Sequence, residues 1–241
     1  MNRNGLIGSV AAVAGMCSVA STAGAATITW YMTNIFYGTV NPVQPIGQLE
    51  VTIASLSATE VQLTLFANWS ASSSQFLGTD GFYFNVNPIL GDPSATYNIA
   101  HTGGQAPTAA FFSPVQYTAA SAPIAGGNAY KADGDGFYDG RIQFDSDKNS
   151  GGRLTGQESS IYKITRDNGG NLAPEDFLFG SQGGTLPNTS YLAGAHVQGV
   201  AIPTGTTSMW MFPGESVIPL PTTAGMSLAG MFLLGLRRRR F

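Results

Sequence analysis

Apolar and polar residues alternate along much of the middle of the chain. In QLEVTIASLSATEVQLTLFANW, residues 48–69, Leu49, Val51 and Ile53 alternate with polar positions, and the alternation resumes at Val61 and Leu63 after a Ser-Ala-Thr turn. A period of two places these side chains on one face of a pleated strand. The segment therefore predicts a β-hairpin with one buried face.

The same pattern recurs from end to end of the middle region. GFYFNVNP, residues 81–88, repeats it and closes at Pro88, which cannot donate to a strand ladder. Further strands are predicted at Thr27–Tyr37, Ala95–Ala100, Ala110–Tyr117, Phe137–Asp145, Ser160–Thr165, Tyr191–Ile202 and Thr207–Phe212. Turn-forming residues separate them, and Pro174–Phe177 predicts one short helical turn. Around ten short strands favour an all-β fold, an antiparallel β-sandwich of jelly-roll or related Greek-key type.

The first 25 residues have a different composition. A basic start at Arg3 precedes an apolar stretch, Leu6–Ala20, and then Ala23-Gly24-Ala25. This order is typical of a secretory signal peptide with a small-residue cleavage site at Ala23 and Ala25. We expect cleavage after Ala25 or one residue later, which leaves a β-sandwich domain over residues 26–216. The single cysteine, Cys17, lies in the segment that is removed, so the mature domain needs no disulfide.

The expected mature domain is acidic. Charged residues make up only 10% of the chain, and residues 26–217 carry six Lys or Arg against fourteen Asp or Glu, a net charge of −8. No Lys or Arg occurs between Thr27 and Tyr130. Nucleic-acid binding depends on basic residues that neutralise phosphates, so this composition argues against a nucleic-acid partner.

Residues 217–241 form a third region, VIPLPTTAGMSLAGMFLLGLRRRRF. As a helix, the fifteen residues of Thr222–Leu236 would span about 22 Å, against a hydrocarbon core about 30 Å thick. With Val217–Pro221 the segment reaches the required ~20 residues. Arg237, Arg238, Arg239 and Arg240 follow it and predict a cytoplasmic C-terminus. Glycines dilute the apolar residues, so we expect a transmembrane helix that retains the protein transiently.

This region resembles the C-terminal sorting signal of the PEP-CTERM family. The resemblance rests on Pro219-Leu220-Pro221, the Gly/Ala/Leu-rich span and the arginine cluster, with Leu220 in place of the family's glutamate. It implies recognition by an exosortase-type transpeptidase, transient insertion in the cytoplasmic membrane and release to the cell surface or the extracellular matrix. Weaker similarity to β-sandwich PEP-CTERM bodies of unestablished activity lies in KADGDGFYD (131–139), IQFD (142–145), EDF (175–177) and AHVQGV (195–200).

The densest group of carboxylates is a candidate calcium site. Asp133, Asp135 and Asp139 lie in a Gly-rich stretch, and calcium prefers six to eight oxygen ligands. The EF-hand pattern matches only partly, because Phe137 occupies the fifth position and no Glu follows at the twelfth. The alternative is an Asp-Gly turn that leads into a strand. We therefore expect no obligatory cofactor, with calcium as the alternative.

Other candidate residues indicate structure rather than catalysis. His196 lies in a predicted strand and is expected to be hydrogen-bonded there, whereas His101 is expected in an exposed loop. The usual nucleophile and metalloenzyme motifs are missing from the sequence. Several aromatic residues could form a sugar-binding platform, although packing in the core is the favoured interpretation: Trp69, Tyr83, Tyr97, Tyr130, Tyr138 and Tyr191.

The sequence therefore predicts an exported structural or interaction protein without catalysis of its own. Its precursor is expected in the cytoplasmic membrane and its mature form at the cell surface or outside the cell. The alternative function is a carbohydrate-binding module, calcium-assisted through the aspartates, with extracellular polysaccharide as its partner. A hydrolase that uses two carboxylates is a third hypothesis.

Overall fold

The structure, a computed structural model, describes residues 26–38, 47–86, 97–112, 130–132, 136–147, 151–166, 169–181 and 191–214. These residues form strands and one 3₁₀ helix, η2, and contain no α-helix. The elements are β1 (Thr27–Gly38), β2 (Gln48–Ser55), β3 (Glu60–Asn68), β4 (Phe76–Phe84), β5 (Tyr97–Gly104), β6 (Ala109–Phe112), β7 (Tyr130–Lys131), β8 (Phe137–Tyr138), β9 (Gly140–Gln143), β10 (Leu154–Thr155), β11 (Ser159–Arg166), η2 (Pro174–Phe177), β12 (Ala193–Ile202) and β13 (Gly205–Pro213). The all-β prediction is confirmed.

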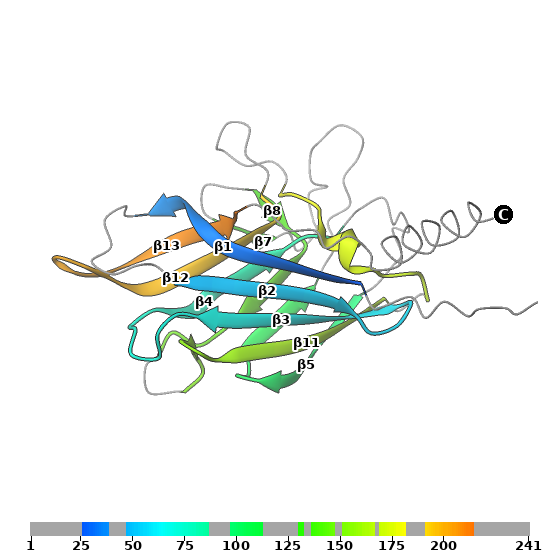
Figure 1. The fold of residues 1–241 in the computed structure, drawn as a ribbon, viewed down its shortest axis with the longest axis horizontal. Coiled ribbons are helices and arrows are strands. Elements are labelled where there is room, and N and C mark those ends of the chain that lie inside the picture. The colour runs from blue at the N-terminus through cyan, green and yellow to red at the C-terminus, as the bar shows by residue number, and fades with distance from the viewer. Residues whose placement is uncertain are drawn as a thin grey trace, which may run out of the picture.

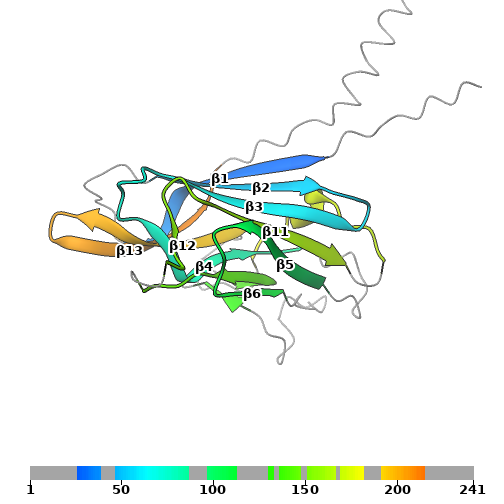
Figure 2. The ribbon, with the colours of Figure 1, turned by 90° about the horizontal axis from the view of Figure 1, so that it is seen from below.

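Most strands belong to one large antiparallel sheet. Its order is β5-β11-β3-β2-β1-β13-β12-β4-β9-β6, with β10 paired to β4, and β7 pairs only with β8. The sheet curves over itself, and its two end strands, β5 and β6, contact each other (Figures 1 and 2). The sheet is therefore nearly closed around its apolar face.

The hairpin of β2 and β3 follows the predicted period of two. Its pairing is regular over its whole length, from Gln48 opposite Asn68 to Ser55 opposite Val61. The alternate residues Leu49, Val51 and Ile53 of β2 are buried, as are those of β3 that face the same way. With Trp30 of β1 they form part of one continuous apolar core. The hydrophobic effect acts on this whole face, so the hairpin supplies much of the buried apolar surface.

The longest interruption of the strand pairing lies between β4 and β12. Leu77 of β4 lies opposite Val197, and Phe82 lies opposite Ala195, so residues 78–81 of β4 face a single residue of β12, His196. A bulge of this kind removes residues from the ladder and redirects their side chains. Gly81 lies within it at φ +38°, where a Cβ atom would collide with the carbonyl oxygen of Ile142.

A second bulge lies in β12, where the register with β13 shifts between Val197 and Val200. Gly199 adopts φ +69° there, and a Cβ atom at this position would collide with the carbonyl oxygen of Ser74. The Ser74 hydroxyl in turn donates to the carbonyl oxygen of Gly199. This hydrogen bond attaches the loop between β3 and β4 to the middle of β12.

Both predicted targeting segments, residues 1–25 and 217–241, lie outside the described residues. Within the part of the chain that the structure does describe, no helix is both long enough and apolar enough to span a bilayer. The predicted turn at Pro174–Phe177 is the 3₁₀ helix η2, which packs against β1 and β2. Its Asp176 carboxylate accepts a hydrogen bond from the backbone N–H of Ala173 at 2.8 Å, so the acid caps the turn.

Candidate functional site

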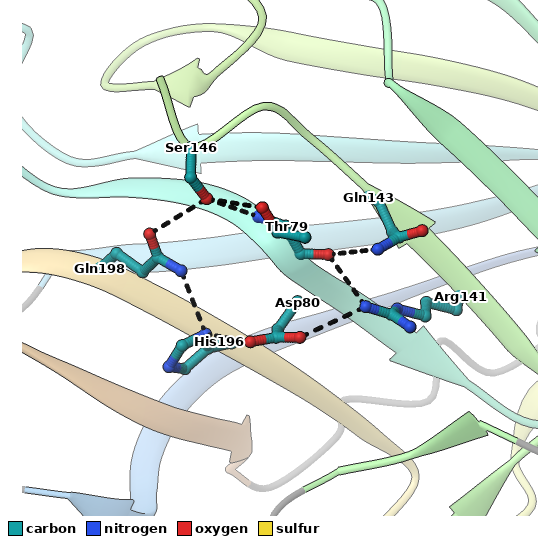
Figure 3. Close-up of polar contacts among 7 residues, drawn as sticks. All are labelled: Thr79, Asp80, Arg141, Gln143, Ser146, His196 and Gln198. Carbon is teal, nitrogen blue, oxygen red and sulfur yellow. Dashed lines mark hydrogen bonds and ion pairs between the residues drawn. The ribbon is translucent and has the colours of Figure 1, made fainter. Parts of the chain in front are cut away.

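The bulge of β4 carries a connected group of polar side chains, which we name the polar cluster. Its members come from β4, β9, β12 and the segment that follows β9: Thr79, Asp80, Arg141, Gln143, Ser146, His196 and Gln198 (Figure 3). Asp80 is about half exposed, whereas only 13% of the His196 side chain is exposed. The cluster thus lies at the surface with one side against the sheet.

The backbone of Thr79 contacts three other members of the polar cluster, Arg141, Gln143 and Ser146. Its carbonyl oxygen accepts hydrogen bonds from Gln143 Nε2 at 2.7 Å and from Arg141 Nη2 at 3.1 Å. Its backbone N–H donates to Ser146 Oγ at 2.9 Å, and the two hydroxyl oxygens lie 2.8 Å apart. The bulge frees these backbone groups from the strand ladder, and side chains then satisfy them.

Asp80 links Arg141 to His196 within the polar cluster. Its Oδ1 lies 3.2 Å from Arg141 Nη2, and its Oδ2 lies 3.4 Å from His196 Nδ1. His196 Nδ1 also lies 3.4 Å from Gln198 Nε2, and the Oε1 of Gln198 lies 3.4 Å from Ser146 Oγ. Protonated His196 would therefore donate to Asp80, and neutral His196 can accept from Gln198.

Aromatic rings lie beneath the charged members of the polar cluster. The His196 ring stacks on Trp210 with centroids 4.8 Å apart, and the Arg141 guanidinium lies 5.5 Å from the centre of the Tyr83 ring. Trp210 and Tyr83 are both buried and lie 5.4 Å apart. Burial raises the pKa of the nearby Tyr130 hydroxyl, and the positive charge of Arg141 opposes that rise. Stacking holds the His196 ring in place, and a cation–π contact holds the Arg141 guanidinium.

The polar cluster contains a serine, a histidine and an aspartate, but their order differs from that of a catalytic triad. In a triad the imidazole accepts the proton of the nucleophilic hydroxyl directly. Here the amide of Gln198 stands between Ser146 and His196. An amide is not a general base at neutral pH, so this hydrogen-bond path does not activate Ser146.

A polar groove adjoins the polar cluster and shares Ser146 and Gln198 with it. Its volume is about 1080 Å³, at the upper end of the range for ligand sites. Its lining comes from the β3–β4 loop, the segment around β10 and the β12–β13 hairpin: Ser72, Ser73, Ser74, Gln75, Phe76, Ser146, Arg153, Thr155, Gln198, Gly199, Thr206, Thr207 and Ser208. Eight of these residues carry hydroxyl groups and two carry amides. We name this feature the hydroxyl groove.

Arg153 is the charged residue in the lining of the hydroxyl groove. Its guanidinium lies on the ring of Phe76, with Cζ 3.8 Å from the ring centre. Nε donates to the carbonyl oxygen of Ser146 at 3.1 Å, and Nη2 donates to the same oxygen. These three contacts restrict the plane of the guanidinium.

Of the three predicted calcium ligands, only Asp139 lies among the described residues. Its side chain is buried in the turn between β8 and β9, and 2% of the residue is exposed. Oδ2 accepts a hydrogen bond from the Val86 N–H at 2.9 Å, and the Asp139 N–H donates to Asn85 Oδ1 at 3.0 Å. These bonds tie the turn between β8 and β9 to the residues that follow β4.

Other predicted site residues lie outside the described ranges. These are Asp133 and Asp135 of the calcium hypothesis, Ala23 and Ala25 of the signal cleavage site, and Pro219, Leu220, Pro221, Arg237, Arg238, Arg239 and Arg240 of the sorting motif. Among the residues that the structure describes, no group of three or more His, Cys, Asp or Glu is arranged to hold a metal ion.

His101 corrects the sequence analysis. It lies in β5 and not in a loop, and its ring contacts Tyr162 edge-on at 5.5 Å. Adjacent glycines favour a turn in sequence, but Gly103 and Gly104 continue the strand here. Its exposure was predicted correctly.

The six candidate aromatics do not form one exposed platform. Trp69, Tyr83 and Tyr138 are buried, and the Trp69 indole donates to the carbonyl oxygen of Gln75 at 3.0 Å. The half-buried Tyr191 packs against Phe36 and Phe212. The core interpretation therefore holds for the buried three.

Sequence reasoning identified His196 but missed the other members of the polar cluster. The available signal was GTDG, residues 78–81, because two glycines within a strand pattern indicate a bulge. Gly78 is needed for a second reason: a Cβ atom there would lie 2.5 Å from Ser146 Oγ and 2.9 Å from Gln198 Oε1. Nothing in the local sequence indicates which distant residues cover this glycine.

Comparison with known proteins adds no relative to this description. No family model matches the chain, and neither a curated protein nor a solved structure matches it.

Proposed function

We propose that the protein is an exported structural or interaction component of the cell surface or extracellular matrix, without catalysis of its own. In this proposal the antiparallel sheet is a sandwich of jelly-roll or related Greek-key type, preceded by a signal peptide. The C-terminal segment holds the precursor in the cytoplasmic membrane until an exosortase-type enzyme processes it. The observation that carries the proposal is the order Pro219-Leu220-Pro221, apolar span and four arginines.

The geometry of the polar cluster supports a role without catalysis. Its charged groups hold the β4 bulge in shape: Arg141 pairs with Asp80 and bonds to the Thr79 carbonyl oxygen. Ser146 likewise satisfies the Thr79 N–H. Side chains that make these hydrogen bonds and ion pairs keep the surface around the bulge in a fixed shape, and a protein that binds a partner requires such a surface.

The test of the sorting proposal is the mass of the mature protein in cells. The double variant Pro219→Ala/Pro221→Ala is expected to keep its arginine tail and remain in the membrane fraction, whereas the unaltered protein loses the tail. Pro203→Ala, at the exposed tip of the β12–β13 hairpin, is the matched control and should be processed normally. An arginine-tailed form in all three samples would overturn the proposal.

A carbohydrate-binding module is the second candidate function, and the hydroxyl groove is the observation that favours it. Hydroxyls and amides both donate and accept hydrogen bonds, which suits the hydroxyl groups of sugars. Calcium bound through Asp133, Asp135 and Asp139 would assist this function. Retention on polysaccharide that chelator abolishes supports both statements. Retention that chelator leaves unchanged supports only the carbohydrate-binding function. The absence of a thermal shift on addition of calcium would contradict the calcium hypothesis.

A further inference from the structure

The hydroxyl groove combines two kinds of recognition in one place. Eight hydroxyl residues and two glutamines line it, and Arg153 adds a positive charge with a fixed orientation. No Asp or Glu is among its described lining residues. Such a surface matches a ligand that is rich in hydroxyl groups and carries a negative charge.

The hydrogen bonds of Arg153 within the protein determine which of its N–H donors remain for a ligand. A guanidinium has five N–H donors, and Arg153 uses one on Nε and one on Nη2 for the carbonyl oxygen of Ser146. Both Nη1 donors and the second Nη2 donor remain. The Nη1 and Nη2 pair is a fork that matches the two oxygens of a carboxylate.

Among the described residues, no carboxylate lies within ion-pair distance of Arg153, whereas Arg141 and Lys163 each have such a partner. Contact with Phe76 and the Ser146 carbonyl already restricts the Arg153 side chain, so less conformational entropy is lost when a ligand binds. The charge is therefore both held in place and available.

The acidity of the domain limits the kind of anion. Residues 26–217 carry a net charge of −8, and Asp145 and Asp147 flank Ser146 in the sequence. A polymer with a charge on every unit would be repelled at long range. A chain whose carboxylates are separated by neutral sugars can place one of them at Arg153 and fill the rest of the groove with hydroxyl groups.

We propose that the hydroxyl groove binds a glycan with isolated uronic-acid residues, and that Arg153 binds the uronate carboxylate. This inference rests on the carbohydrate-binding function proposed above. Ser146 and Gln198 belong to both the groove and the polar cluster, so the β4 bulge fixes one wall of the site.

Calorimetric titration with a defined oligosaccharide tests the inference. The probe is a hyaluronan octasaccharide, in which glucuronate alternates with a neutral sugar, and its carboxyl-reduced form has a neutral hydroxymethyl group in place of each carboxylate. Alginate oligosaccharides and octasaccharides of neutral glucans complete the panel. The unaltered protein is expected to bind the octasaccharide at least tenfold more tightly than its reduced form, because a charge-assisted hydrogen bond contributes about 1.5–3 kcal/mol.

Four variants distinguish the groove from the rest of the surface. Arg153→Gln is expected to remove the preference for the carboxylate, and Arg153→Lys to keep only part of it, since an ammonium group lacks the fork. Lys163→Gln on β11 removes the same charge away from the groove and should bind as the unaltered protein does. Thr206→Trp places a large ring at an exposed residue of the groove lining and should abolish binding.

Each outcome has a defined meaning. Binding of neutral and reduced glycans that Thr206→Trp abolishes but Arg153→Gln leaves unchanged would overturn the uronate inference and retain the carbohydrate-binding function. No binding to any member of the panel would overturn both. If Arg153→Gln lowers the melting temperature, the comparison of the two octasaccharides by the unaltered protein and by Thr206→Trp still decides the question.

Discussion

The β2–β3 hairpin and the β4–β12 pair belong to the same sheet but use their residues differently. In the hairpin every residue from Gln48 to Ser55 has a partner on β3, and alternate side chains enter the core. In the β4–β12 pair, residues 78–81 leave the ladder and their polar groups bond to side chains from three other segments. Regular pairing buries apolar surface, whereas interrupted pairing presents polar groups at fixed positions. The two regions should therefore respond differently to mutation.

The largest effect is expected in the regular hairpin. Leu63→Ala removes a fully buried side chain from β3 and should lower the free energy of unfolding by about 2–5 kcal/mol. Urea unfolding followed by tryptophan fluorescence measures the loss. Leu56→Ala, the same substitution at an exposed position beside the hairpin turn, is the control and should change stability by less than about 0.5 kcal/mol. Equal losses for the two variants would mean that the hairpin face is not the core.

The next effect is expected at the β4 bulge. Gly81→Ala places a Cβ atom against the carbonyl oxygen of Ile142 at a backbone angle of φ +38°, and should cost about 2–3 kcal/mol. Gly103→Ala in β5 adds a Cβ atom that meets only Ile161 Cδ1 at 3.7 Å, so it should cost little. The difference in their unfolding midpoints measures the strain at the bulge. A harmless Gly81→Ala would show that the bulge can relax.

A smaller effect is expected within the polar cluster. Ser146→Ala removes the acceptor of the Thr79 N–H and the link to Gln198, and should cost about 1 kcal/mol. Ser57→Ala, which removes one exposed local hydrogen bond in the β2–β3 turn, should cost less. Hydrogen exchange of the Thr79 amide gives a direct signal: it should become faster in Ser146→Ala and stay unchanged in Ser57→Ala.

The smallest effect is expected at the 3₁₀ helix η2, which packs against β1 and β2. Burial raises the pKa of Asp176 above its ordinary value of 3.8, although the hydrogen bond from Ala173 opposes the rise. The folded state then holds the Asp176 proton more tightly than the unfolded state does, so ionisation above this range costs some stability. The unaltered protein should therefore gain stability relative to Asp176→Asn as the pH falls toward 4.

Thermal unfolding of both proteins between pH 4 and pH 7 measures this difference. Asp176→Asn lacks the titrating carboxyl and should show the flatter pH profile of the two. A difference between Asp176→Asn and the unaltered protein that grows as the pH rises above 7 would contradict the assignment.

Local pattern was sufficient to predict most strands, because a period of two is a property of each strand by itself. The one strand predicted at Phe137–Asp145 is two strands, β8 and β9, which belong to different sheets. The hairpin, the limits of β11 and the turn at Pro174 all follow from neighbouring residues. The short strands β7 and β10 were missed, since two residues carry no period. The hydroxyl groove was also missed: its walls come from segments that are distant in sequence, and serine-rich loops look alike whether or not they meet another strand.

The hydroxyl groove has one more consequence, for how folding and binding are coupled. Its lining comes from residues 72–76, from Ser146, Arg153 and Thr155, and from residues 198–199 and 206–208. The pairings of β4 with β10 and β12 bring these segments together. No single hairpin contains the site, so a partly folded chain lacks a complete binding site for a ligand. A ligand present at a hundred times its dissociation constant would then stabilise the whole domain by about 2.7 kcal/mol. If the proposed glycan is that ligand, the protein would be most resistant to unfolding where the glycan is most abundant.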